Sequence, residues 1–565
     1  MATHRSSDRP ARRRHPLCGL RWTVRPPSRW QVAVRASVAI GAPVTTMTLL
    51  GDQPAGLLMG TGAFTVLYAA GRPWRSRLRL LLGVAASFVL CACLGTLASG
   101  SAPASVALVV GVATVATFLC HSLRVGVPGA FFFVLVAGLG GYLPMHGVAP
   151  AGFVISTAVG AAFAVVVAMA DLAVRPHGPQ RDAVARARAA VDAFLSGPRA
   201  GEEAYRRSAA AGDALHHGWA TLADGRARGE RADALLAELG GVQRAYSAHL
   251  LPGDAPDPEL AAEQAEAPLG RPTARQLLRH AARWPSNPLQ ATVRVAVGVA
   301  AAGLLASALD VDHVYWTMAA TMLVLHTGLD RRGTAVRAAH RLVGTVVGLG
   351  IFLLVHVGAA DSPWLVVAVV VLLQGLVELF VARAYAVAVV FITPLALTIG
   401  TAGTDLSVTP VVSERLLDTA VGVVIGALVP WVVLARGAPR LLAACIARVL
   451  VAVATAVEHL GAGTHRTSAG RHALRDLALT MQEMSAAAGR TLRDDPAGVA
   501  PLLALRESTA WLGLTVLARG AVETTPASHV EGAAWACRVL ARRTAAGDPP
   551  EPTDVYRVRA AVAGR

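Results

Sequence analysis

Residues 415–436 read RLLDTAVGVVIGALVPWVVLAR, a run in which apolar residues dominate and which ends at Arg436. A helix needs about 20 mostly apolar residues to cross the hydrocarbon core of a bilayer, so this stretch predicts a transmembrane helix. Runs of the same kind begin near residues 31, 53, 78, 103, 127 and 150, and near residues 291, 314, 338, 363 and 384. The sequence therefore predicts an all-α polytopic membrane protein with twelve transmembrane helices.

The same stretch indicates an internal duplication. Its Thr419-Ala-Val-Gly422 is identical to Thr157-Ala-Val-Gly160, 262 positions earlier. Further matches at nearly this offset pair Gln31, Arg35, Asp52, Gly83 and Arg124 with Gln290, Arg294, Asp312, Gly344 and Arg383. Each half has an even number of spans, so the two six-helix repeats should share one orientation and be related by an axis along the membrane normal.

Composition agrees with a membrane protein. Of the 565 residues, 54% are hydrophobic and 16% are charged, and the mean hydropathy of +0.50 is too high for a soluble enzyme of this length. The net charge of +16 comes from arginines that flank apolar runs, which argues against nucleic-acid binding. The six cysteines are scattered and predict neither a disulfide framework nor a metal site. No cofactor is expected.

Loop charges predict the topology, because arginine and lysine stay on the cytoplasmic side of short loops. One set of alternate loops carries Arg72, Arg75, Arg77, Arg79, Arg124, Arg331, Arg332, Arg337 and Arg383. The other set carries Asp52, Asp310, Asp312, Asp361 and Asp405. We therefore expect a multi-pass protein of the cell membrane with both termini in the cytoplasm.

Five regions follow from this pattern. They are a basic N-terminal segment (1–30), the first repeat (31–174), a cytoplasmic helical domain (175–289), the second repeat (290–436) and a cytoplasmic helical region (437–565). The central domain should contain helices near 181–197, 202–222 and 229–250, followed by a Pro-rich linker from Pro252 to Pro272. Arginine-rich faces of both cytoplasmic regions are expected to lie near anionic lipid headgroups.

The second half resembles the fusaric acid resistance, or aromatic acid exporter, family of membrane proteins. The resemblance rests on Tyr315-Trp316-Thr317, on Thr334, Arg337, Arg341, Gly344-Thr345 and Gly348, on Arg383-Ala-Tyr385 with Phe391-Ile-Thr393-Pro394, and on Arg415-Leu-Leu-Asp418-Thr419 with Gly422. It implies an efflux transporter for aromatic or other organic carboxylate anions. His326 stands where the family pattern has glutamine, and the first half lacks an Arg-x-x-Asp before Thr157.

Charged residues in or near the spans are the candidate substrate-binding residues, since a charge at mid-bilayer costs about 2.5 to 3.5 kcal/mol. Arg35 and Arg294 occupy equivalent places in the two repeats and could draw organic anions to the inner mouth, or anchor helices to headgroups. Arg415 and Asp418 share a helical face, where an ion pair and a substrate contact are both open. His326 is either a titrating group or a polar interface residue.

Two other functions stay open at this point. A transporter of the major facilitator type would explain twelve spans, and Gly328-Leu-Asp330-Arg331-Arg332-Gly333 resembles its inner-loop motif, although the spacing differs. A non-transporting scaffold for envelope assembly is the second, and a homo-oligomer is compatible with all three. An enzyme is not expected, because the outer loops are short. Since the sequence shows no acidic residue near the middle of a predicted span, we expect the membrane potential to drive export without a coupled proton.

Overall fold

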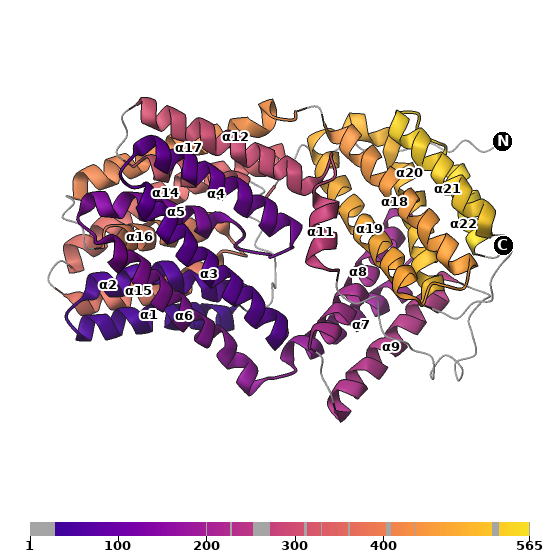
Figure 1. Ribbon diagram of the computed structural model, residues 1–565, viewed down its shortest axis with the longest axis horizontal. Helices are drawn as coiled ribbons and strands as arrows, with labels where there is room; N and C mark the ends of the chain where they lie inside the picture. Colours follow the sequence, from indigo (N-terminus) through magenta and orange to yellow (C-terminus); the bar gives the residue numbers. More distant parts are fainter. Residues whose placement is uncertain are drawn as a thin grey trace, which may run out of the picture.

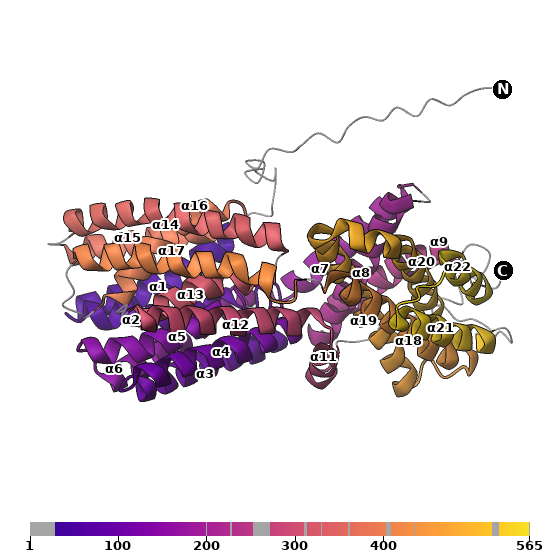
Figure 2. The same cartoon turned by 90° about the horizontal axis from the view of Figure 1, so that it is seen from above.

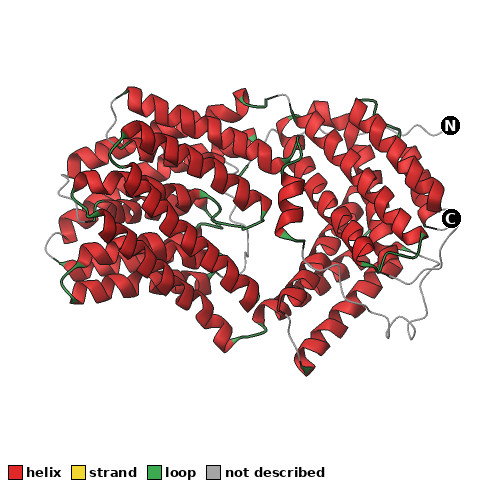
Figure 3. Ribbon diagram, in the orientation of Figure 1, coloured by secondary structure: helices red, strands yellow, loops and turns green. Residues whose placement is uncertain are grey.

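The computed structural model describes residues 29–198, 201–225, 229–251, 272–309, 313–328, 330–359, 362–402, 408–435, 437–521 and 530–563. Within these ranges the chain forms helices and no strand (Figure 3), so the prediction of an all-α protein is confirmed. Several predicted features lie outside the described residues. They are nearly all of segment 1–30, the linker except Pro272, and Asp310, Asp312, Asp361, Asp405 and Arg436.

The helices form two bodies that lie side by side (Figure 1). The first body contains the helices of both predicted repeats. In the first half these are α1 (Trp30–Leu49), α2 (Gln53–Ala63) with the 3-10 helix η2 (Phe64–Leu67), α3 (Trp74–Ala98), α4 (Ala102–Ser122), α5 (Phe131–Tyr142) with η3 (Leu143–His146), and α6 (Pro150–Val174). In the second half they are α12 (Asn287–Ala308), α13 (Val314–Leu325), α14 (Arg331–Ala359), α15 (Pro363–Phe380), α16 (Tyr385–Gly400) and α17 (Val408–Val432).

The second body is built from the two segments that the sequence predicts to be cytoplasmic. Its helices are α7 (Gly178–Leu195), α8 (Gly201–Gly225), α9 (Glu230–Leu250), α11 (Ala274–Ala281), α18 (Ala438–Gly461), α19 (Ser468–Asp494), α20 (Pro496–Gly520), α21 (Val530–Ala546) and α22 (Pro552–Val562). Each body has its own large hydrophobic core. The core of the second body joins α7–α9 to α18–α22, although more than 180 residues separate these segments in the sequence.

Nine described helices are long and apolar enough to cross a membrane, whereas the sequence predicts twelve spans. Eight of the nine belong to the first body, and the ninth is α18. In α18, 67% of the apolar window is buried inside the protein, so its apolar surface packs against the other helices of the second body. Helices α5 (with η3), α13 and α16 of the first body are apolar but shorter than a standard span, and α2 is shorter still.

Corresponding helices of the two halves pack in the same pairs. In the first half α2 contacts α1 and α6, and α3 contacts α5; in the second half α13 contacts α12 and α17, and α14 contacts α16. Contacts between the halves are reciprocal as well. The first helix of each half packs on the fourth helix of the other, so α1 packs on α15 and α12 packs on α4. In Figure 2 the helices α14–α16 and the helices α3 and α4 lie on opposite sides of the first body.

Glycines allow the closest of these contacts. A Cβ atom on Gly160 would lie 2.0 Å from the carbonyl oxygen of Met59, and one on Gly422 would lie 2.4 Å from that of Thr317. The identical Thr-Ala-Val-Gly segments therefore bring α6 onto α2 and α17 onto α13, since small residues let helix backbones approach closely in lipid. Gly83 has no neighbour within 4 Å, unlike its repeat counterpart Gly344, which packs tightly on Val389.

Candidate functional site

A cavity of about 550 Å³ lies inside the first body, between helices of both halves. Its wall is mostly apolar and carries the aromatic rings of Phe64, Phe131, Phe132, Trp316 and Tyr385. Five arginines also line it, namely Arg29, Arg124, Arg337, Arg341 and Arg415. Among the described lining residues, Glu378 carries the one carboxylate. The pocket therefore combines an apolar, aromatic wall with an excess of positive charge.

Arg341 and Arg415 are the most deeply buried of these arginines. Arg341, on α14, is 2% exposed, and Arg415, on α17, is 6% exposed. The Nε and Nη1 atoms of Arg341 and the Nε atom of Arg415 are buried and have no hydrogen-bond partner among the residues that the structure describes. The two guanidinium groups are close enough to repel each other electrostatically. Each of these two guanidinium groups therefore has hydrogen-bonding capacity that the described residues do not use.

Aromatic rings hold the arginines in place. The Arg415 guanidinium lies over the ring of Trp316 at 4.1 Å, and the Arg337 guanidinium lies over the ring of Tyr385 at 3.9 Å. Arg337 also donates a hydrogen bond from Nε to the carbonyl oxygen of Leu323 at 2.9 Å. Because Arg337 and Arg341 are four residues apart on α14, they lie on one face of that helix.

A second layer of rings packs against Trp316. The rings of Trp316 and His313 are 4.7 Å apart. A hydrogen bond of 2.5 Å joins His313 Nε2 to the Tyr142 hydroxyl, and His313 Nδ1 lies 2.5 Å from the carboxylate of Glu414. This layer connects α5, the start of α13 and α17, and it covers the end of the pocket at Trp316.

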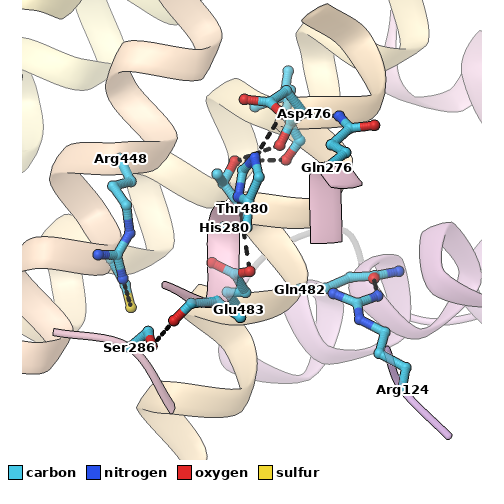
Figure 4. A network of polar contacts seen from close by, with 12 residues as sticks. Arg124, Gln276, His280, Ser286, Arg448, Asp476, Thr480, Gln482 and Glu483 are labelled. Atoms are coloured by element: carbon cyan, nitrogen blue, oxygen red, sulfur yellow. Dashed lines mark hydrogen bonds and ion pairs between the residues drawn. The ribbon is translucent and has the colours of Figure 1, made fainter. Parts of the chain in front are cut away.

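The opposite end opens beside Val127, a lining residue that is 76% exposed. Here the second body touches the pocket wall through α19. The lining residue Arg124 donates a hydrogen bond to the side chain of Gln482 (Figure 4), and Arg490 donates to the carbonyl oxygen of Gly328 at 3.4 Å. Arg493 donates to Asp330 at 2.8 Å. Helix α19 therefore holds both loops that frame this opening.

Helix α11 ties α19 to the beginning of α12. His280 and Gln276, on α11, contact the carboxylate of Asp476 at 2.6 and 2.9 Å, and Glu483 lies 3.8 Å from His280 (Figure 4). Burial acts to raise the pKa of Asp476, but the hydrogen bonds from His280 and Gln276 outweigh it and lower that pKa below its ordinary value. Asp476 is therefore a carboxylate that stabilises this junction in its charged form.

The pKa values of two further charged groups at this junction are also shifted. Burial, together with the positive charge of Arg294, lowers the pKa of Arg490 to about 10. Burial raises the pKa of Asp213 on α8, although a hydrogen bond with Gln482 and the charge of Arg124 oppose the shift. Asp213, Gln482 and Arg124 thus form one polar chain from the second body to the pocket opening.

The residues that the sequence singled out divide into two groups. Arg415 and His326 line the pocket, and Asp418 lies beside it, where its Oδ1 accepts a hydrogen bond from Thr317 Oγ1 at 2.7 Å. His326 is buried, and its backbone carbonyl is 2.7 Å from Nε2 of His121. These three residues therefore belong to one region of the structure.

Arg35 and Arg294, by contrast, do not line this pocket. Arg35 forms an ion pair with Asp171 at 2.6 Å, and Arg77 binds the other oxygen of that carboxylate at 2.9 Å. Arg294 donates from Nε to the carbonyl oxygen of Val433 at 3.3 Å and faces the junction with α19. Arg35 and Arg294, which the sequence predicts to attract anions, therefore lie outside the pocket. Each guanidinium binds at or directly after the last helix of its own half.

One expectation about acidic residues depends on where the last span begins. The sequence predicts that this span begins near residue 415, which places Asp418 at its end. The helix begins at Val408, so Asp418 lies ten residues inside α17 and is 1% exposed. Export without a coupled proton stays a prediction.

Arg341 is the site residue that sequence reasoning did not single out. It appeared as part of the family pattern, but the span was expected to begin near residue 338, which put Arg341 at a helix end. The helix begins at Arg331, so Arg341 lies well inside it. A search for arginines four residues apart within an apolar helix would have found Arg337 and Arg341.

Comparison with known proteins agrees with this architecture. Residues 300–429 match the family model described as fusaric acid resistance protein-like. The chain is 27% identical over 470 residues to the uncharacterized membrane protein YvaC of Bacillus subtilis (strain 168), and the match covers 71% of this chain and 72% of that protein. No solved structure matches the chain significantly. The chain is therefore a multi-pass membrane protein in which residues 300–429 are similar to fusaric acid resistance proteins.

Proposed function

We propose that this protein is a transporter that exports organic carboxylate anions across the cell membrane. The observation that carries the proposal is the pair of buried guanidinium groups, Arg341 and Arg415, in an otherwise apolar and aromatic pocket. Guanidinium matches the two oxygens of a carboxylate in a planar, bidentate arrangement. The aromatic wall suits the apolar part of an organic acid. The similarity of residues 300–429 to fusaric acid resistance proteins supports a role in efflux.

In this proposal the first body crosses the membrane twelve times as two parallel six-helix repeats. The matching helix pairs of the two halves support the repeat. The equivalent positions Asp171 and Val433, 262 residues apart, also bind the equivalent arginines Arg35 and Arg294. Four helices are short for a standard span, but they pack between longer helices of the same body, which reduces their contact with lipid.

The second body supports the proposed orientation. Helix α19 binds Arg124, in the loop after α4, and Asp330, in the loop after α13. The positive-inside pattern assigns both loops to the cytoplasm, and the second body must lie on the same side as the loops that it touches. The pocket then opens toward the cytoplasm beside Val127, and the layer formed by Trp316, His313 and Tyr142 separates it from the outside. Such an inward-facing pocket is the arrangement that an exporter needs to load its cargo.

The test is efflux of a labelled aromatic acid, such as benzoate, from cells or inside-out vesicles that contain equal amounts of wild type, Arg341→Gln, Arg415→Gln or Arg332→Gln. Arg332 is a matched control, because it lies on α14 with Arg341 but is exposed and does not line the pocket. We expect both pocket variants to lose at least tenfold in apparent affinity, or about 1.4 kcal/mol, while Arg332→Gln transports normally. Normal transport by Arg341→Gln and Arg415→Gln would contradict the proposal.

A further inference from the structure

The charge balance of the pocket indicates the charge of its cargo. The positive charges of two of the five lining arginines are compensated by partners at the rim of the pocket. Arg29 forms an ion pair with Glu378 at 3.0 Å, and Arg124 binds Gln482 and interacts electrostatically with Glu483 and Asp213 of the second body. Arg337, Arg341 and Arg415 remain in the interior.

These three arginines form a row. Arg341 interacts electrostatically with Arg337 on one side and with Arg415 on the other. Asp418 acts electrostatically on this row through Arg415, and Glu414 contacts His313. Three positive charges and one negative charge leave an excess of two positive charges. An uncompensated charge is strongly unfavourable away from water, so a bound anion with two negative charges would balance the row.

The polar residues that line the pocket provide two positions for anionic groups. At the first position, Arg341 has unpartnered Nε and Nη1 donors and Arg415 has an unpartnered Nε donor, among the residues that the structure describes. At the other end of the row, the Arg337 guanidinium stacks on Tyr385, whose hydroxyl is buried and has no hydrogen-bond partner in the described part of the chain. Between and around these ends the wall is apolar and aromatic, as suits the carbon skeleton that joins two carboxylates.

We propose that the preferred cargo is a dicarboxylate, with one carboxylate bound between Arg341 and Arg415 and the second at Arg337 and Tyr385. This assignment rests on the proposed export of carboxylates and adds the number of charges. A monocarboxylate fills the first position and leaves Arg337 without an anion. A dicarboxylate with the same ring occupies both positions, and its affinity exceeds that of the monocarboxylate by at least tenfold.

The experiment is competition against labelled isophthalate in proteoliposomes at pH 7.5, where both carboxyl groups of isophthalate are ionised. The competitors are isophthalate, its monomethyl ester and benzoate. The ester keeps the shape of isophthalate but has one charge. We expect isophthalate to compete at concentrations at least tenfold lower than either monoanion.

The variant Arg337→Gln locates the second position. It should reduce the advantage of isophthalate over its monoester to less than threefold, and a monodisperse elution profile of the purified variant shows that it is folded. Arg332→Gln should keep the full advantage. Equal competition by isophthalate and benzoate in the wild type would overturn the dicarboxylate assignment and leave carboxylate export intact. An unchanged advantage in Arg337→Gln would overturn the placement of the second carboxylate. Absence of transport for every acid would overturn the proposed function itself.

Discussion

Asp418 is an acidic side chain beside the proposed carboxylate position. It accepts a hydrogen bond from Thr317 and acts electrostatically on Arg415, which we assign to the anion. Its negative charge therefore opposes the approach of a substrate carboxylate to the same guanidinium. Two unit charges about 4 Å apart interact by about 1 kcal/mol in bulk water and by about 4 kcal/mol where the effective dielectric constant is about 20.

The variant Asp418→Asn should consequently bind the anion more tightly. We expect its half-saturating substrate concentration for efflux to fall by about tenfold, which corresponds to about 1.4 kcal/mol. Concentration-dependent efflux at a fixed amount of protein measures this directly. Thr317→Val is the control, because it removes the hydrogen bond and keeps the charge. A weaker affinity in Asp418→Asn would show that the carboxylate orients Arg415 and does not compete with the substrate.

Sequence reasoning found part of this site, for identifiable reasons. Arg415, Asp418 and His326 stood out because charged or titratable side chains in apolar runs are rare. Arg35 and Arg294 stood out for the same reason and for their equivalent places in the two repeats. The sequence could not show that Arg35 binds the last helix of the first half and that Arg294 binds the residue after the last helix of the second half. The residues that a buried arginine faces depend on how the helices pack together, and the periodicity of a single helix gives no information about that packing.

At the scale of helices, Gly422 is the clearest packing position. It brings α17 onto α13 so closely that a Cβ atom would lie 2.4 Å from the carbonyl oxygen of Thr317. Both helices supply pocket residues, namely Arg415 from α17 and Trp316 from α13. Separation of these helices would therefore disturb the stacking of Arg415 on Trp316 as well as the fold.

We expect Gly422→Ala to destabilise the protein by about 1 to 3 kcal/mol, the usual range for overpacking. The readout is the thermal midpoint and the yield of monodisperse protein in detergent. Gly350→Ala on α14 is the matched control, since a Cβ atom there has no neighbour within 4 Å and alanine favours a helix over glycine. Equal stability of the two variants would show that the contact between α13 and α17 is looser than the structure describes.

Helix positions were easier to predict than helix ends. The expected helices at 181–197, 202–222 and 229–250 correspond to α7 (Gly178–Leu195), α8 (Gly201–Gly225) and α9 (Glu230–Leu250). The spans expected near 338 and 415 begin seven residues earlier, at Arg331 and Val408. The first turn of α14 is polar, and the second turn of α17 contains Ser413, Glu414 and Arg415, so hydropathy places both starts too late. As a result, Arg341 and Asp418 lie farther from the helix ends than the sequence indicates.

At the scale of the whole molecule, the contacts between the two bodies predict the membrane topology. Helix α19 contacts the loops after α4 and α13, so these loops and the second body share one side of the membrane. Reporter fusions after residues 75, 124, 230, 332 and 500 should be cytoplasmic, and fusions after residues 100, 146, 311, 361 and 405 should be external. Two or more reversed positions would be incompatible with twelve spans in this orientation.

The central claim is that a carboxylate binds between Arg341 and Arg415, and equilibrium binding to purified protein tests it without any assumption about driving force. Labelled isophthalate should bind wild type and Arg332→Gln with equal affinity. The same should hold for labelled benzoate. Binding of both acids should weaken at least tenfold in Arg341→Gln and in Arg415→Gln, and the double variant should show no saturable binding. Wild-type affinity for both acids in the double variant would contradict the claim and place the carboxylate outside this pocket.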